Sequence, residues 1–282
     1  MAWLNRPRSE PSLTVSKEIS IDGGRAHYLE LGRGKPVVLL HGIPGDSRTW
    51  RYNVDVLASR FRVLALDLPG WGRSEMPRRF AYSLEDLARF VHGFSTALEL
   101  ERPSLMGLHL GGLVALETAL RHPDQMGRLV VIGAPLLSTD TPLRLEPPGS
   151  LLGRLLFKLG SARAVKRLMR RGFLDRGNLS ADLVPGYARA LRRGRTLQGI
   201  ALGNAAIRER WPELRRDLAR LATPTLAVWG AEDAVTPLDN ARFLVDTAPN
   251  AALHVVGHTG HCCHEEAPAG FNRAVMEFLG GR

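Results

Sequence analysis

Cysteine is almost absent from this chain: only 2 of its 282 residues are cysteine, and they are adjacent, at Cys262 and Cys263. Two neighbouring cysteines cannot cross-link distant segments, so a disulfide framework is excluded and a reducing compartment, the cytoplasm, is expected. Long apolar runs are missing too. A membrane-spanning helix needs a stretch of about 18 apolar residues, and the sequence contains none, so no such helix is expected. The first residues carry charge and proline without an apolar core, which is unlike a secretory signal peptide.

Acidic residues are also in short supply. The chain has 38 Lys and Arg against 28 Asp and Glu, a net charge of +10. Residues 138–222 hold 18 of the basic and 7 of the acidic residues, whereas the rest of the chain is close to neutral. A basic excess can indicate a nucleic-acid partner, but no nucleic-acid-binding motif or basic–aromatic platform accompanies this one. We therefore expect no nucleic-acid partner. The excess of basic residues is concentrated in one internal block, residues 138–222.

Short apolar runs alternate with segments of helical spacing through most of the chain. Eight runs predict strands: Val15–Ile21, Ala26–Leu31, Pro36–Leu40, Phe61–Leu66, Ser104–Leu108, Leu129–Ile132, Thr225–Trp229 and Ala251–Val256. Helices are predicted over Ser47–Arg60, Ser83–Leu98 (with Ser83 as the N-cap), Leu110–Arg121 and Pro268–Leu279. This alternation predicts an α/β fold with a mainly parallel central sheet and helices on both faces.

The alternation breaks in residues 136–222, which have helical spacing, many arginines and no convincing strand. The predicted organisation is an N-terminal extension (1–14), a first core segment (15–135), an inserted helical cap (136–222) and a second core segment (223–282). Cap residues such as Leu151, Leu155 and Leu159 predict an amphipathic helix whose apolar face covers a pocket. Its basic face is either simply solvated or attracts an anionic substrate, an acyl-carrier or CoA thioester, or an acidic membrane surface.

Loop motifs follow several of the buried strands, where the carboxyl ends of strands in an open α/β sheet bind ligands. They are His41-Gly42-Ile43-Pro44-Gly45, Asp67-Leu68-Pro69-Gly70-Trp71-Gly72-Arg73-Ser74, Gly107-Leu108-His109-Leu110-Gly111-Gly112, Gly230-Ala231-Glu232-Asp233, and Gly260-His261. In this order and with these gaps, the motifs resemble the cap-bearing α/β-hydrolase superfamily from about Val15 to Leu279. The resemblance implies the α/β-hydrolase fold, a hydrolase acting on a small apolar ester or C–C bond, and no cofactor.

The family orders its catalytic residues as nucleophile, acid and histidine. This order falls on His109, Asp233 and His261. By the resemblance, His261 is the general base, and Asp233 accepts a hydrogen bond from its other ring nitrogen. The backbone N–H groups of Ile43 and Leu110 would form the oxyanion hole.

The chain departs from the family at the nucleophile itself. The family motif is Gly-x-Ser-x-Gly, whereas here His109 stands between Gly107 and Gly111, and the aspartate of the dehalogenase and epoxide-hydrolase branches is absent too. Three interpretations stay open. His109 is a nucleophile for activated esters, since imidazole with a pKa of about 6.5 is mostly neutral at pH 7; or it forms an acid/base pair with His261 in a lyase, isomerase or cofactor-independent enzyme; or the protein is a degenerate, ligand-binding one.

The remaining motif residues have simpler interpretations. Trp71 and Leu108 are expected to line an apolar substrate pocket. His41 and Asp67 are expected to hold their loops rather than to react. The cysteines and histidines near His261 could suggest zinc, but adjacent cysteines are poorly placed to chelate one ion together, so no metal is expected.

Overall fold

The computed structural model describes residues 15–21, 23–43, 45–75, 80–137, 166, 170–175 and 208–281. At its centre is one eight-stranded sheet in the order β1-β2-β4-β3-β5-β6-β7-β8. The strands are β1 (Val15–Ile21), β2 (Gly24–Leu31), β3 (Pro36–Leu40), β4 (Arg62–Leu66), β5 (Ser104–Leu108), β6 (Leu129–Ile132), β7 (Thr225–Gly230) and β8 (Ala251–Val256). Strand β2 pairs antiparallel with β1 and β4, and all other pairs are parallel. The predicted α/β class and its eight strands are confirmed.

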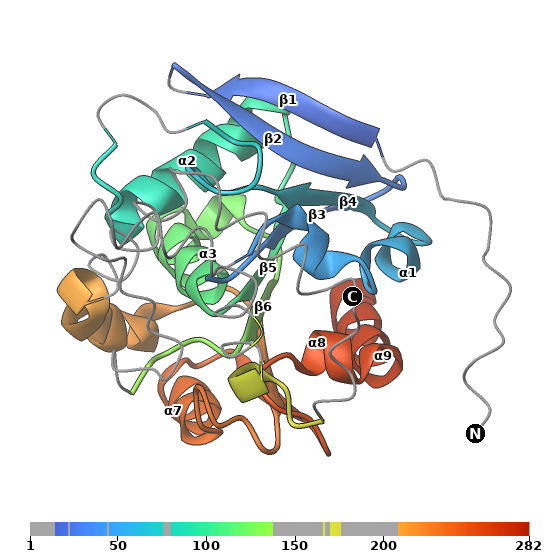
Figure 1. The fold of residues 1–282 in the computed structure, drawn as a ribbon. Helices are drawn as coiled ribbons and strands as arrows, with labels where there is room; N and C mark the ends of the chain where they lie inside the picture. Colours follow the sequence, from blue (N-terminus) through green and yellow to red (C-terminus); the bar gives the residue numbers. More distant parts are fainter. Residues whose placement is uncertain are drawn as a thin grey trace, which may run out of the picture.

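Helices cover both faces of this sheet (Figure 1). On one side lie α2 (Leu84–Ala97), α3 (Leu110–Arg121) and α7 (Asp239–Thr247); on the other lie α1 (Val54–Ala58) and α9 (Pro268–Gly280). The strands pack against both layers because their successive side chains point to opposite faces. On β3, for example, Val38 and Leu40 belong to the α2/α3 core, whereas Val37 and Leu39 belong to the α1/α9 core. The continuous apolar runs of the sequence are therefore strands buried on both faces.

Two helix predictions had different outcomes. The side-chain oxygen of Ser83 accepts a hydrogen bond of 3.0 Å from the backbone N–H of Asp86, so the predicted N-cap of α2 is confirmed. The single helix expected over Ser47–Arg60 is wrong: a 3-10 helix, η1 (Ser47–Trp50), is followed by a turn and then by α1. Between them, Asn53 donates to the carbonyl of His264 and to Asn272 on α9. These long-range contacts hold the chain in a turn, which local periodicity does not reveal.

The proposed cap lies mostly outside the described residues. Within 136–222 the structure describes 136–137, 166, 170–175 and 208–222, so the helix expected around Leu151–Leu159 and the N-terminal extension 1–14 are not covered. The described piece 170–175 packs against the loop that carries His261, since the backbone N–H of Cys262 donates to Gly172 (3.1 Å). In the parts of the chain that the structure describes, no helix is both long and apolar enough to cross a membrane.

Candidate active site

The sharp turn between β5 and α3 presents His109 at its tip. Its backbone has φ 51° and ψ −113°, a conformation that side-chain-bearing residues rarely adopt. The turn depends on the two flanking glycines. A Cβ on Gly107 would lie 2.1 Å from the carbonyl oxygen of Gly111, and a Cβ on Gly111 would lie 2.2 Å from that of Leu40. The strand–turn–helix elbow therefore exists here with histidine at the tip.

Asp233 and His261 come from the loops after β7 and β8 and meet beside this elbow. Oδ2 of Asp233 lies 2.9 Å from Nδ1 of His261, so the carboxylate accepts from that ring nitrogen. Oδ1 accepts from the backbone N–H groups of Val235 (2.8 Å) and Thr236 (2.9 Å). Burial alone would raise the pKa of Asp233, but His261 and the two backbone donors outweigh burial and hold this pKa below its ordinary value. The carboxylate thus stays ionised and orients His261.

The His109 ring lies edge-on to the His261 ring, with 5.4 Å between the ring centroids and 83° between the planes. His109 is buried, and among the described residues neither of its ring nitrogens has a hydrogen-bond partner. Burial, assisted by the charge of His261 and opposed by Asp233, lowers the pKa of His109 to about 3. His109 is therefore a neutral imidazole at pH 7, and neither its lone pair nor its N–H is hydrogen-bonded to a described residue.

The loop after β3 closes the other side of the elbow. A Cβ on Gly42 would lie 3.1 Å from the Cβ of His109. Nδ1 of His41 donates to the Gly42 carbonyl (2.9 Å), and its Nε2 accepts from the backbone N–H of Leu68 (3.1 Å). These contacts agree with the expected structural role of His41. Since α3 begins at Leu110, the backbone N–H of that residue has no acceptor within the helix.

The two predicted pocket residues are both buried. The Trp71 ring meets His41 and Tyr82 edge-on, at 5.9 and 6.1 Å between centroids. Leu108 packs in the α1/α9 core. Their role in a substrate pocket stays a prediction.

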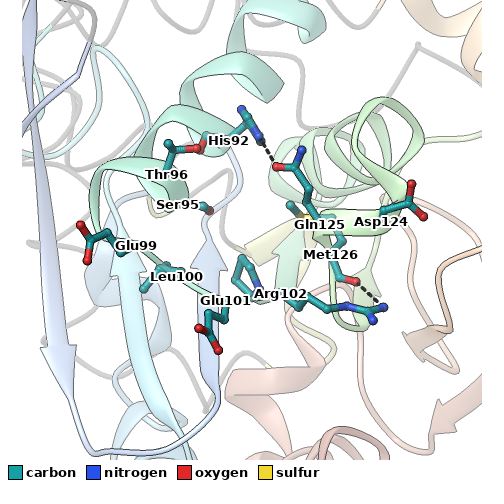
Figure 2. A pocket seen from close by; sticks show the side chains of 11 residues that line it. His92, Ser95, Thr96, Glu99, Leu100, Glu101, Arg102, Asp124, Gln125 and Met126 are labelled. Atoms are coloured by element: carbon teal, nitrogen blue, oxygen red, sulfur yellow. Dashed lines mark hydrogen bonds between the residues drawn. The ribbon is translucent and has the colours of Figure 1, made fainter.

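A cavity of about 550 Å³ opens elsewhere, between the end of α2, the following loop and η2 (Pro123–Gln125). Figure 2 shows His92 bonded to Gln125 on one side of it, and Arg102 bonded to the backbone of Met126 on the other. Its loops precede β5 and β6, whereas His109, Asp233 and His261 follow the carboxyl ends of their strands. This cavity is therefore separate from the candidate active site.

Two residues of the site are not predicted by the sequence motifs. Gly133, directly after β6, has φ 53°, and a Cβ there would lie 2.5 Å from Cε1 of His261. The hydroxyl of Thr236 donates to Oδ2 of Asp233 (2.9 Å) and lies 3.1 Å from Nδ1 of His261. Two signals were present: a glycine ending a buried strand, and a threonine three residues after the acid.

The two cysteines that follow His261 are not arranged as metal ligands in the described part of the chain. Among the residues that the structure describes, no group of three His, Cys, Asp or Glu side chains is arranged to hold a metal ion. Cys262 and Cys263 are buried, and burial raises the pKa of both thiols. They are therefore poor nucleophiles.

Comparison with known proteins identifies the family of this chain. A family model described as alpha/beta hydrolase fold matches residues 35–268. A 2-hydroxymuconate semialdehyde hydrolase of Pseudomonas sp. is 31% identical and covers 98% of this chain and 97% of its own length. A 2-hydroxy-6-oxononadienedioate/2-hydroxy-6-oxononatrienedioate hydrolase of Burkholderia vietnamiensis is 31% identical, with 90% and 91% covered.

Solved structures of similar proteins show the same fold. Cfl2 of Burkholderia cenocepacia superposes with a TM-score of 0.83 at 26% identity, over 96% of this chain and 98% of that one. A meta-cleavage product hydrolase of Pseudomonas fluorescens gives 0.76 at 26% identity, over 94% and 97%. The chain belongs to the α/β-hydrolase fold family and is similar to hydrolases of meta-cleavage products.

Proposed function

We propose that this protein is a hydrolase of small carbonyl compounds, either activated esters or ketones cleaved at a C–C bond, in which His109 replaces the usual serine nucleophile. One observation carries the proposal. A buried, neutral imidazole without a hydrogen-bond partner among the described residues faces His261, and His261 is oriented by Asp233.

In the proposed first step, one ring nitrogen of His109 attacks the substrate carbonyl carbon. Attack alone would create an acyl-imidazolium cation in a site where burial disfavours charge on His109. The second ring nitrogen must therefore give its proton to Nε2 of His261, which passes it to the leaving group. The rings share no hydrogen bond in this structure, so they must approach when substrate binds, as catalytic hydrogen bonds often do.

The second step releases the acyl group. His261 takes a proton from water, the resulting hydroxide attacks the acyl carbon, and the imidazole of His109 leaves and is reprotonated. The backbone N–H groups of Ile43 and Leu110 are the proposed donors to the oxyanion of both steps. Leu110 supports this role because it opens α3, directly after the elbow residue.

The proposed substrate class combines an apolar body with a carboxylate. The similar hydrolases are named for 2-hydroxymuconate semialdehyde and a 2-hydroxy-6-oxononadienedioate, which are carboxylates. The basic excess of residues 138–222 has the sign that attracts such an anion to the site.

The rival acid/base interpretation requires one of the two rings to hold a proton for delivery near pH 7. With a pKa of about 3, His109 is not that ring. A lyase or isomerase would then rely on His261 alone as the acid, while His109 could only accept protons weakly. A neutral His109 beside a His261 that Asp233 orients therefore supports nucleophilic attack over the acid/base interpretation.

The test compares wild type, H109A, H109S and H261A on 4-nitrophenyl butyrate and on 2-hydroxymuconate semialdehyde. We expect wild type to turn over at least one substrate and H109A and H261A to lose about 10²–10⁴-fold in kcat. Circular dichroism would establish that each variant is folded. Full activity in H109A would remove His109 from the chemistry. An inactive wild type combined with a gain in H109S would identify a degenerate site.

A further inference from the structure

A serine–histidine–aspartate chain lies at the antiparallel edge of the sheet, apart from the elbow. Ser16 is on β1, His27 on β2, and Asp67 follows β4. Oγ of Ser16 lies 2.8 Å from Nε2 of His27, and Nδ1 of His27 lies 2.7 Å from Oδ2 of Asp67. Three strands separate β1 from β5, so at about 4.8 Å per strand this edge is roughly 19 Å from the elbow.

The donors around these residues determine where each proton sits. Burial opposes ionisation of Asp67, but hydrogen bonds from His27 and from backbone N–H groups prevail and lower its pKa. The carboxylate can only accept, so Nδ1 of His27 donates to it, and in the neutral ring Nε2 is then the acceptor. The Arg73 guanidinium, which can only donate, lies 3.0 Å from Oγ of Ser16. The hydroxyl proton of Ser16 therefore points to Nε2 of His27, as in an activated serine.

The serine is accessible and the two groups behind it are buried, as a reactive serine requires. Ser16 is exposed, whereas the side chains of His27 and Asp67 are 3% and 2% exposed. The backbone N–H groups of Ser47 (2.6 Å) and Arg73 (2.9 Å) donate hydrogen bonds to the Asp67 carboxylate. Asp67 therefore both keeps its loop in place and orients His27. A substrate can thus reach the hydroxyl, while the base behind it stays fixed.

We propose that Ser16 is a second nucleophile, which accepts an acyl group from an activated ester with His27 as base and the Arg73 guanidinium as oxyanion donor. A bond forms between Oγ of Ser16 and the acyl carbon, and the bond from that carbon to the leaving oxygen breaks. The serine proton moves to Nε2 of His27 and then to the departing alkoxide. The product is an ester on Ser16, which water converts to the free acid. Nothing in this step depends on His109.

The same strand offers a matched control. Ser20 is exposed and, four residues along β1, points to the same face as Ser16. Both ring nitrogens of His27 are engaged, one by Ser16 and one by Asp67, so none is left to activate Ser20. Ser16 and Ser20 thus differ in activation but share residue type, strand and exposure.

The first experiment labels the folded protein with an alkyl fluorophosphonate and maps the adduct by mass spectrometry. The label forms a bond from serine oxygen to phosphorus and releases fluoride; the elbow offers it no serine. We expect one adduct, on Ser16, that is lost in S16A, reduced in R73Q and retained in S20A. No adduct, an adduct only on another serine, or equal labelling of Ser16 and Ser20 would overturn the proposal.

A second measurement does not depend on the labelling reagent. Iodoacetamide alkylation rates are compared in S16C and S20C, with the two buried native cysteines giving a low background. A thiol beside His27 and Arg73 should ionise more readily, and each unit of lowered pKa raises the thiolate fraction about tenfold at pH 7. We expect S16C to react about tenfold faster or more. Equal rates would mean that His27 only caps β1.

Discussion

His109 stands edge-on to His261, 5.4 Å away between ring centroids, and only His261 of the two is anchored by a hydrogen bond to a carboxylate. The two rings are therefore held differently. His261 is held in one tautomer by Asp233, whereas no hydrogen bond to a described residue fixes the tautomer of His109. Replacing the family's serine by histidine exchanges a small hydroxyl, which needs an adjacent base, for a larger group that is nucleophilic in its neutral form.

Stability should fall as the pH is lowered from 6.5 towards 3. His109 has a folded pKa of about 3, below the unfolded value of about 6.5, so in this window the unfolded chain binds a proton that the folded chain does not. Stability is then lost at roughly 1.4 kcal/mol per pH unit for this one group.

The H109S substitution removes the contribution of His109 to the pH dependence of the unfolding free energy. Urea unfolding at pH 7 and pH 5 should show a change in unfolding free energy smaller by about 2 kcal/mol than in wild type. H258N is the control, because His258 is exposed and its φ of 55° suits asparagine. An identical pH dependence in wild type and H109S would contradict the buried, neutral state of His109.

Thr236 should act as a positioning residue. T236V removes the hydroxyl that donates to Oδ2 of Asp233, so the carboxylate holds His261 less firmly. A lost hydrogen bond of about 1 kcal/mol corresponds to about fivefold in kcat, and KM should stay unchanged. T236S keeps the hydroxyl and should restore the rate and its pH profile. Equal kinetics in T236V and T236S would mean that the hydroxyl does not support the pair.

Gly133 should be required for the position of His261. G133A places a Cβ 2.5 Å from Cε1 of His261 and adds strain at φ 53°. We expect a loss of about 1–3 kcal/mol in unfolding free energy, together with a fall in kcat. Gly257, directly after β8, has open space around its Cβ position, so G257A should change neither quantity through contact. Wild-type activity in G133A would show that His261 works from another position.

Salt should separate charged from neutral substrates. If the basic block 138–222 attracts carboxylates, raising the salt concentration will increase KM for 2-hydroxymuconate semialdehyde, because screening shortens the Debye length to about 3 Å at 1 M. KM for neutral 4-nitrophenyl butyrate should not change. Equal responses of the two substrates would leave the block as a merely solvated surface.

Periodicity and motif spacing predicted all eight strands and the loops that meet at the site. They succeeded because a sheet buried on both faces leaves uninterrupted apolar runs, and because Gly107 and Gly111 are needed wherever the elbow forms. The geometry around Gly133 and Thr236 was not foreseen, since it depends on how the loops after β6, β7 and β8 approach one another. The link from Ser16 through His27 to Asp67 joins two strands and the loop after a third, so no local pattern could indicate it.

The most direct test of His109 as the nucleophile is stopped-flow spectroscopy with 4-nitrophenyl cinnamate, with every protein in an S16A background so that the proposed second nucleophile is absent. Nucleophilic attack by His109 predicts a burst of one nitrophenolate per site and the transient absorption of a cinnamoyl-imidazole. That absorption should be replaced by the spectrum of a cinnamoyl ester in H109S and be lost in H109A. Steady release without the transient, with H109A as fast as wild type, would contradict the role of His109 as nucleophile.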